Sequence, residues 1–138
     1  MNKKILVIED DPNALRFIEY TLEQEGYQVS SAKDGLEGIK KVQDKHPDLI
    51  ILDIMLPGLD GYEVCRQLRQ KPETSLLPIL MLSAKARQDD RNIGLKMGAD
   101  EYLTKPADPS TIVEKVKTLL ASTRLTHLQE SQIEKLQS

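Results

Sequence analysis

The 138-residue chain is poor in cysteine and in aromatic residues. It contains one Cys, no Trp and one Phe, and aromatic residues make up 4% of it. A single cysteine excludes an internal disulfide and is typical of a reducing compartment. The chain also lacks a glycine-rich phosphate loop, so a flavodoxin-like cofactor site with stacking aromatics is the weakest of the functions considered.

Long apolar runs and an excess of positive charge are missing as well. No hydrophobic stretch approaches the length of a membrane span, and the acids at 9–11 interrupt the first apolar run. The formal net charge is −3, and no Lys/Arg cluster escapes nearby acids. We therefore expect a cytoplasmic protein with no membrane contact and no direct nucleic-acid site.

The chain does have a regular alternation of short apolar runs and helical patterns. The apolar runs cover 4–8, 27–31, 49–52, 78–82 and 102–104. Four of them have the length and the Ile, Val and Leu content of buried strands. The second run is half polar, which is typical of an edge strand. Capping acids open the helical patterns, whose apolar stripes include Leu36 in the second helix and Ile93 in the fourth. Five such repeats predict a single α/β domain with a doubly wound, five-stranded parallel sheet in the strand order 2-1-3-4-5.

Polar residues stand where four of these runs end. The first run leads through Glu9 into the acid pair; the third is followed by an acid, the fourth by a hydroxyl and the fifth by an amine. The candidate site residues are Asp10, Asp11, Asp53, Ser83 and Lys105. The carboxyl ends of parallel strands share the edge where open α/β folds bind ligands, so we expect these side chains to converge. Clustered carboxylates repel one another by ~4 kcal/mol per pair at an effective dielectric of 20, which calls for a cation. Mg²⁺ fits such a site because it accepts carboxylates and bridges to phosphate oxygens.

Several short motifs occur in a fixed order along the chain. They are Asp10-Asp11, Asp53 with the sequence LPGLDG at 56–61, Ser83-Ala84, GADEY at 98–102 and Lys105-Pro106. With these motifs, residues 3 to about 121 resemble a receiver domain of the response regulators of two-component systems, such as the chemotaxis regulators. The resemblance implies a flavodoxin-like fold with five helices, in which Asp53 accepts a phosphoryl group from a histidine kinase. Ala107 departs from the pattern, because the family often has a bulky aromatic residue there.

The resemblance and the chemistry of the side chains together predict a role for each site residue. Asp53 is the nucleophile and, with Asp11, a direct Mg²⁺ ligand, while Asp10 acts through a water molecule. The family also implies the Met55 carbonyl as a ligand. Lys105 offers a compact charge to one phosphoryl oxygen, and Ser83 can donate a hydrogen bond to another. The bland alternative for the acid pair is helix capping, although a cap needs only one acid.

Two expectations concern conformation. Ser83 approaches the phosphoryl group while the Tyr102 ring turns inward, which alters the face made by the fourth helix, the fifth strand and the fifth helix; simple packing is the alternative for Tyr102. The Lys105–Pro106 peptide bond is expected to be cis, because Lys105 must turn back toward Asp53 directly after a strand. Only about 5–6% of X–Pro bonds in folded proteins are cis.

The chain divides into a receiver domain at 1–121 and a helical tail or linker at 122–138. The tail carries an apolar stripe of Leu125, Leu128, Ile133 and Leu136. We expect a continuous helix that pairs with its twin in a homodimer; a tail that folds back and a frayed end are the alternatives.

The expected function is that of a phosphorylation-controlled switch that modifies only itself. Its partners would be a sensor histidine kinase or phosphotransfer protein and a downstream protein that the sequence does not name. The rival function is a phosphohydrolase or mutase that works through an aspartyl phosphate. A haloacid-dehalogenase-like enzyme would want an acid two residues after its nucleophile, where this chain has Met55.

Overall fold

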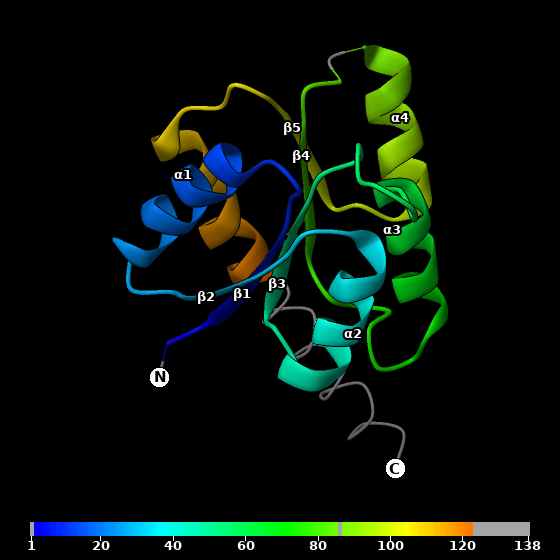
Figure 1. Ribbon diagram of the computed structural model, residues 1–138, viewed down its shortest axis with the longest axis horizontal. Helices are drawn as coiled ribbons and strands as arrows, with labels where there is room; N and C mark the ends of the chain where they lie inside the picture. The colour runs from blue at the N-terminus through cyan, green and yellow to red at the C-terminus, as the bar shows by residue number, and fades with distance from the viewer. Residues whose placement is uncertain (1, 86, 123–138) are drawn as a thin grey trace, which may run out of the picture.

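A computed structural model describes residues 2–85 and 87–122 of the chain. Five parallel strands form one sheet in the predicted order β2-β1-β3-β4-β5 (Figure 1). The strands are β1 (Lys4–Ile8), β2 (Gln28–Ala32), β3 (Leu49–Leu52), β4 (Ile79–Ser83) and β5 (Glu101–Thr104). The order places β1 and β3 side by side, so the residues that follow these two strands become neighbours.

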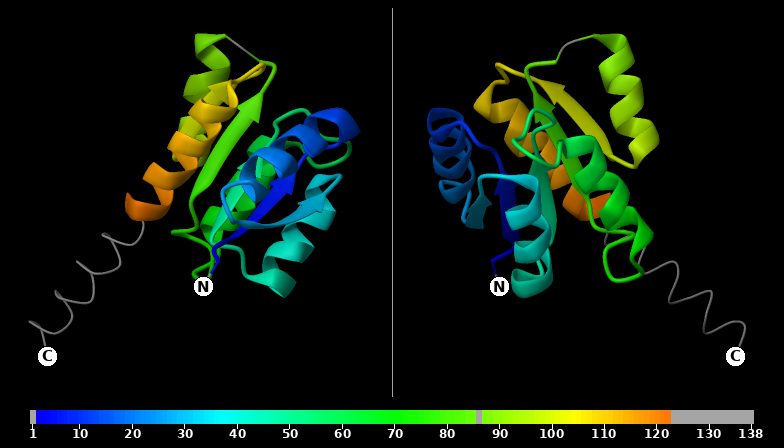
Figure 2. Two further views of the ribbon diagram at one scale, coloured as in Figure 1. Left: turned by 90° about the vertical axis from the view of Figure 1, so that its left-hand side faces the viewer. Right: turned by 45° about the vertical axis from the view of Figure 1, so that its right-hand side comes forward.

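Helices cover both faces of the sheet (Figure 2). They are α1 (Pro12–Glu23), α2 (Gly35–Lys45), α3 (Gly61–Gln70), α4 (Gln88–Met97) and a helix over 109–122. The helix α1 and the 109–122 helix lie on one face, and α2, α3 and α4 lie on the other. Asp11, Asp34 and Asp60 cap α1, α2 and α3, each by accepting a hydrogen bond from an N–H three residues on.

The core consists of two apolar layers, one on each face of the sheet. In β1, Leu6 and Ile8 face the α2 and α3 side, while Ile5 and Val7 pack toward α1 and the 109–122 helix. Because both faces are covered, the central strands are almost wholly apolar, as the sequence pattern predicts. A sheet buried in this way leaves its carboxyl edge as the place for polar groups.

Two residues that were predicted to lie on the buried apolar stripes of α2 and α4 are exposed instead. Leu36 is 70% exposed and Ile93 is 40% exposed. Glycines make the close contacts instead: a Cβ on Gly38 would lie 2.5 Å from Ile8 Cδ1, and a Cβ on Gly94 would lie 2.8 Å from the sulfur of Met81. A count of apolar residues misses such contacts, because a glycine brings the backbone close and adds no side chain to the pattern.

The described residues contain no helix long and apolar enough to cross a membrane. The 109–122 helix reaches the predicted domain boundary at 121. The predicted dimer-forming stripe, Leu125 to Leu136, lies outside the described residues, and its role stays a prediction.

Candidate phosphoryl site

The polar site lies at the carboxyl edge of the sheet. The edge is aligned across the strands, because the Asp53 N–H donates to the Ile8 carbonyl (3.1 Å) and the Lys105 N–H donates to the Ser83 carbonyl (2.8 Å). Glu9 directly follows Ile8 at the same edge, and its N–H donates to the carbonyl of Ala32 (3.0 Å). Side chains far apart in the chain therefore meet, as the sequence predicts.

An ion cluster forms the centre of the site. Lys105 Nζ lies 3.0 Å from Asp53 Oδ2 and also donates to Glu9 Oε1. Both carboxylates are nearly buried, while the Lys105 side chain is 23% exposed. Burial opposes the charge on Lys105, but its hydrogen bonds to the two carboxylates and their negative charges outweigh burial and raise the pKa of the amine. The lysine therefore stays protonated between two acids.

Glu9 is the acid whose titration the site perturbs most. Burial raises the pKa of its carboxyl to about 7, and the neighbouring charge of Asp53 acts in the same direction. The hydrogen bond from Lys105 lowers this pKa, but it does not cancel the cost of burial. One of the two acids beside Lys105 thus holds a proton up to near-neutral pH.

The three acids placed to hold a cation are Glu9, Asp10 and Asp53. One ligand oxygen from each lies within 4.8 Å of the others. Among the residues that the structure describes, Asp11, a predicted direct ligand, belongs to no such group; it is exposed, and its carboxylate accepts the Ala14 N–H (3.0 Å) as the cap of α1. Glu9 takes its place because Glu9 continues from β1 at the sheet edge, whereas the Asp11 carboxylate is bound to the first turn of α1 as its cap.

This donor set fits Mg²⁺. Mg²⁺ binds oxygen ligands at about 2.0–2.1 Å in octahedral geometry, so its ligands lie roughly 3–4 Å apart. Carboxylate oxygens within 4.8 Å of one another approach that spacing. Met55 lies two residues after Asp53, and its N–H donates to Asp53 Oδ1 (3.2 Å). The carbonyl of Met55 as a further ligand stays a prediction.

Ser83 and Tyr102 meet at the backbone of Lys85, a residue that the sequence patterns did not single out. Ser83 is fully buried, and its Oγ accepts the Lys85 N–H at 3.4 Å. The Tyr102 hydroxyl donates to the Lys85 carbonyl at 2.8 Å, with its ring directed into the core, and burial raises the pKa of its phenol to about 12. Lys85 therefore links the hydroxyl of the site to the predicted switch aromatic.

The Lys105–Pro106 peptide bond is cis, as predicted.

A family model, the response regulator receiver domain, matches residues 5–117. The chain belongs to this family. Receiver domains are phosphorylation-dependent signalling switches that accept a phosphoryl group, and their partners are histidine kinases or phosphotransfer proteins. The family match sets the phosphohydrolase alternative aside.

Individual relatives agree with this assignment. The chain is 50% identical over 120 residues to the alkaline phosphatase synthesis transcriptional regulatory protein PhoP of Bacillus subtilis. The aligned residues are 87% of this chain and 49% of PhoP. The chain thus spans about half the length of the curated relatives it matches.

Solved receiver domains share the fold. A CheY-like receiver domain protein from Methanospirillum hungatei has a TM-score of 0.85 at 29% identity, covering 91% of this chain and 99% of its own. The receiver domain of a sensor histidine kinase from Pseudomonas aeruginosa has a TM-score of 0.82 at 31% identity, covering 88% and 99%. Its structure has a magnesium ion coordinated in the active-site cleft.

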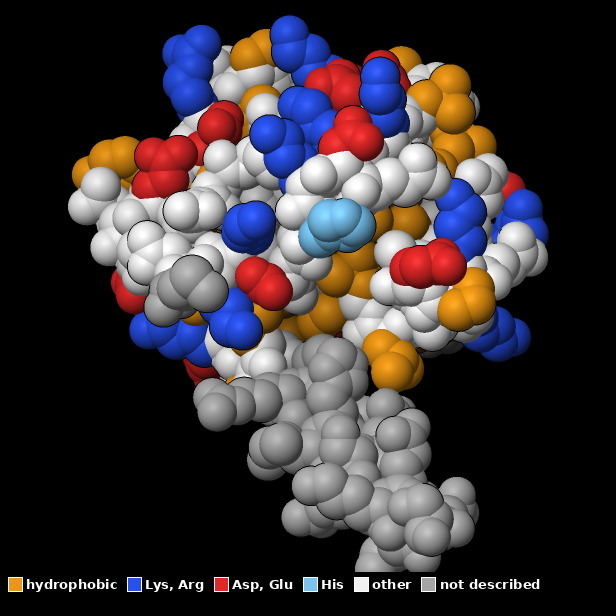
Figure 3. All heavy atoms as spheres, turned by 90° about the horizontal axis from the view of Figure 1, so that it is seen from below, with side chains coloured by type: hydrophobic (Ala, Val, Ile, Leu, Met, Phe, Trp, Pro, Cys, Tyr) orange, Lys and Arg blue, Asp and Glu red, His pale blue; other side chains and the backbone are white. Residues whose placement is uncertain are grey.

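A cavity lies beside the site at the carboxyl edge of the sheet, and a smaller hollow lies at the opposite edge. At the site, a cavity of about 620 Å³ lies between α1 and the start of the 109–122 helix, and its lining includes Phe17, Lys105 and Ala107. Ala107 packs against the core layer of α1 and lines this cavity. At the other edge, a hollow of about 330 Å³ between α2 and α3 includes Val42 and His46 in its lining (Figure 3).

Proposed function

We propose that Asp53 accepts a phosphoryl group from a histidine kinase or phosphotransfer protein, and that the modification changes the face formed by α4, β5 and the 109–122 helix. The observation that supports this most directly is the Asp53 carboxylate at the sheet edge, held by Lys105 and flanked by Glu9 and Asp10. A nucleophile with a cation on one side and further acids on the other suits charge-stabilised phosphoryl transfer.

The proposed phosphoryl transfer requires one nucleophile and one cationic side chain of this domain. A carboxylate oxygen of Asp53 attacks phosphorus and forms an O–P bond, while the P–N bond of the donor phosphohistidine breaks and its electron pair leaves with the imidazole nitrogen. Lys105, now on Asp53 Oδ2, can follow a phosphoryl oxygen on its flexible stem. Since the donor brings its own leaving group, the chain needs no general base.

Asp10 and Asp53 would hold Mg²⁺, with Glu9 and the Met55 carbonyl completing the protein's share of the ligands. The bound ion would neutralise charge that develops on the phosphoryl oxygens. Glu9 gives up its proton more readily near a cation, so its carboxylate would be available once the ion is bound.

The coupling to the surface runs through Lys85. When Ser83 turns its hydroxyl to a phosphoryl oxygen, the Lys85 N–H loses its acceptor, and the Tyr102 hydroxyl bonded to the Lys85 carbonyl must adjust. Phosphorylation shifts the population toward the active state only because that state binds the phosphoryl group better.

Labelling with a small phosphodonor tests the acceptor. Acetyl phosphate with Mg²⁺ should modify the protein at Asp53, and hydroxylamine should remove the label, as it does for acyl phosphates. Asp53→Asn should abolish labelling, whereas Asp60→Asn, a change at the cap of α3 in the same loop, should not. Full labelling of the Asp53→Asn protein would contradict the assignment.

A further inference from the structure

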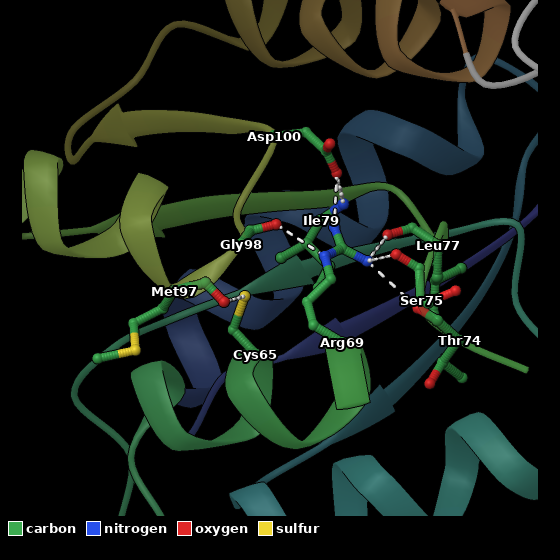
Figure 4. A network of polar contacts seen from close by, with 9 residues as sticks. All are labelled: Cys65, Arg69, Thr74, Ser75, Leu77, Ile79, Met97, Gly98 and Asp100. Carbon is green, nitrogen blue, oxygen red and sulfur yellow. Dashed lines mark hydrogen bonds and ion pairs between the residues drawn. The ribbon is translucent and has the colours of Figure 1, made fainter. Parts of the chain in front are cut away.

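The two ends of α4 are held by different kinds of contact. At its N-terminal end no described side chain caps the helix. The Tyr62 hydroxyl donates a neutral hydrogen bond to the Asp90 carbonyl (3.2 Å), and Arg91 pairs with Glu101 at 3.8 Å, beyond hydrogen-bond distance. Its C-terminal end runs into Gly98 and Asp100, which are bound by the guanidinium of Arg69 (Figure 4). Charged hydrogen bonds are roughly twice as strong as neutral ones, so the two ends differ in how firmly they are fixed.

Arg69 is saturated by this role. Its side chain reaches out from α3, is 19% exposed, and donates to four backbone carbonyls and one carboxylate, those of Thr74, Ser75, Leu77, Gly98 and Asp100. The shortest of these contacts are 2.6 Å to the Leu77 carbonyl and 2.8 Å to the Gly98 carbonyl. A guanidinium has five N–H donors in a rigid plane, so one side chain ties α3, the turn before β4 and the end of α4 together.

The backbone at the end of α4 is shaped to receive Arg69. Gly98 has φ +113, and a Cβ there would lie 2.6 Å from Arg69 Cγ. Asp100 accepts from Arg69 Nη2 (2.9 Å) and from the N–H of Ile79 (2.8 Å), which joins this corner to the first residue of β4. The Cys65 thiol adds a contact to the Met97 carbonyl (3.3 Å). Every contact holds the last turn of α4 to elements that lie away from the phosphoryl site.

The N-terminal end of α4, by contrast, faces the site. Lys85 precedes it, bonded to Ser83 and to the Tyr102 hydroxyl, and the Lys85 ammonium lies 5.8 Å from the centre of the Tyr62 ring. Tyr62 in turn binds the Asp90 carbonyl in the first turn. Ser83 is therefore linked to the start of α4 through the backbone and ammonium of Lys85 and then through Tyr62.

We infer that Arg69 makes the C-terminal end of α4 a fixed pivot, so that phosphorylation of Asp53 reorients α4 from its N-terminal end. The inference rests on the proposed function and adds the direction of the movement. Between the two ends, Gly94 lies against the Tyr102 ring, where a Cβ would come within 3.1 Å of it, so the ring sits beside the middle of the moving helix.

Amide NMR spectra of the full chain, with and without beryllofluoride and Mg²⁺ as the phosphoryl mimic, test this. In the unmodified protein the mimic should shift the amides of 87–91 and leave those of 97–100 unchanged. In Arg69→Gln the shifts should extend to 97–100, and without the mimic these amides should exchange about tenfold faster, the factor that ~1.4 kcal/mol of lost local stability gives.

Arg66→Gln is the matched control, because Arg66 is on the same helix, is exposed and pairs with Glu63 on the helix surface. It should keep the pattern of the unmodified protein. Asp100→Asn removes one charge of the network and should act as Arg69→Gln does, to a smaller degree; it decides the matter if Arg69→Gln fails to fold.

The outcomes separate the two proposals. Shifts at 97–100 as large as those at 87–91 in the unmodified protein, with the amides of 53–55 and 105 also shifted, overturn the pivot alone. The pivot is also overturned if both variants keep the unmodified pattern. No shift at 53–55 or 105 would overturn the proposed function, and the pivot with it.

Discussion

Two part-buried cations, Lys105 and Arg69, hold this receiver domain together in opposite ways. Lys105 lies between the carboxylates of Glu9 and Asp53, so its local environment has more negative than positive charge. Arg69 donates mainly to backbone carbonyls and has one carboxylate partner, so its contacts are saturated and nearly balanced.

The difference between their contacts determines which of the two side chains can change its hydrogen-bond partners. Lys105 has a flexible stem and can exchange a carboxylate oxygen for a phosphoryl oxygen at little cost. Arg69 cannot leave without taking a charged donor from four backbone carbonyls. We therefore expect substitution of Arg69 to act mainly on stability, and substitution of Lys105 to act mainly on the response to phosphorylation.

The largest effect on stability is expected for Arg69→Ala. The change takes the charged donor from the part-buried carbonyls of Leu77 and Gly98, while the Asp100 carboxylate keeps the Ile79 N–H but loses its cation. This should lower the free energy of unfolding by about 3 kcal/mol. Urea denaturation followed by circular dichroism measures this. Arg66→Ala, which removes an exposed pair, should cost less than about 0.5 kcal/mol. Equal losses for the two variants would mean that the Arg69 network is no stronger than a surface ion pair.

Lys105→Ala should act on the site more than on the fold. It removes one charged hydrogen bond to the phosphoryl mimic, worth about 1.5–3 kcal/mol, so the affinity for beryllofluoride with Mg²⁺ should fall about 10–100-fold. Lys115→Ala is the control, because Lys115 pairs with Glu101 (3.7 Å) away from the site. An unchanged affinity in a titration followed by NMR would remove Lys105 from the site. Lys105→Arg should also impair the response, because a planar guanidinium does not replace a compact ammonium.

The smallest effect is a pH dependence from Glu9. Its pKa in the folded protein is about 7, above the usual 4.5, so the protonated form favours folding. This contribution is complete below pH 4.5 and is lost as the pH rises through about 7. Mg²⁺ favours the carboxylate and should move the midpoint to lower pH, as ¹³C NMR of the Glu9 carboxyl would show. Glu9→Gln should remove this step, and a midpoint near 4.5 without Mg²⁺ would refute the shift.

Much of the fold follows from local patterns in the sequence. The apolar runs mark the five strands to within one residue at most ends, and the capping acids Asp34 and Asp60 mark the helix starts. Both signals are local, since strand burial and helix capping depend on neighbouring residues. The alternation of strand and helix predicts a parallel, doubly wound sheet, and the half-polar second run agrees with the edge position that the order 2-1-3-4-5 gives it.

The site was predicted less completely, for a physical reason. Sequence shows that three acids follow the first strand, but only the three-dimensional structure shows that Glu9 still bonds to the neighbouring strand while the Asp11 carboxylate caps α1. A shift of one residue changes which side chain faces the cluster. Arg69 gave no signal, because four of its five partners are backbone carbonyls, which are the same for every sequence, and the fifth, Asp100, lies 31 residues away in the chain.

The contact between Glu9 and Lys105 also bears on how the domain is made. The two residues are 96 positions apart, and they directly follow the ends of β1 and β5, the first and last strands in the chain. A nascent chain that has not yet released β5 from the ribosome would have the acids and the nucleophile without their counter-charge. Competence for phosphorylation should therefore arrive late in synthesis, after the last strand has joined the sheet, so that a kinase finds a substrate only in a finished domain.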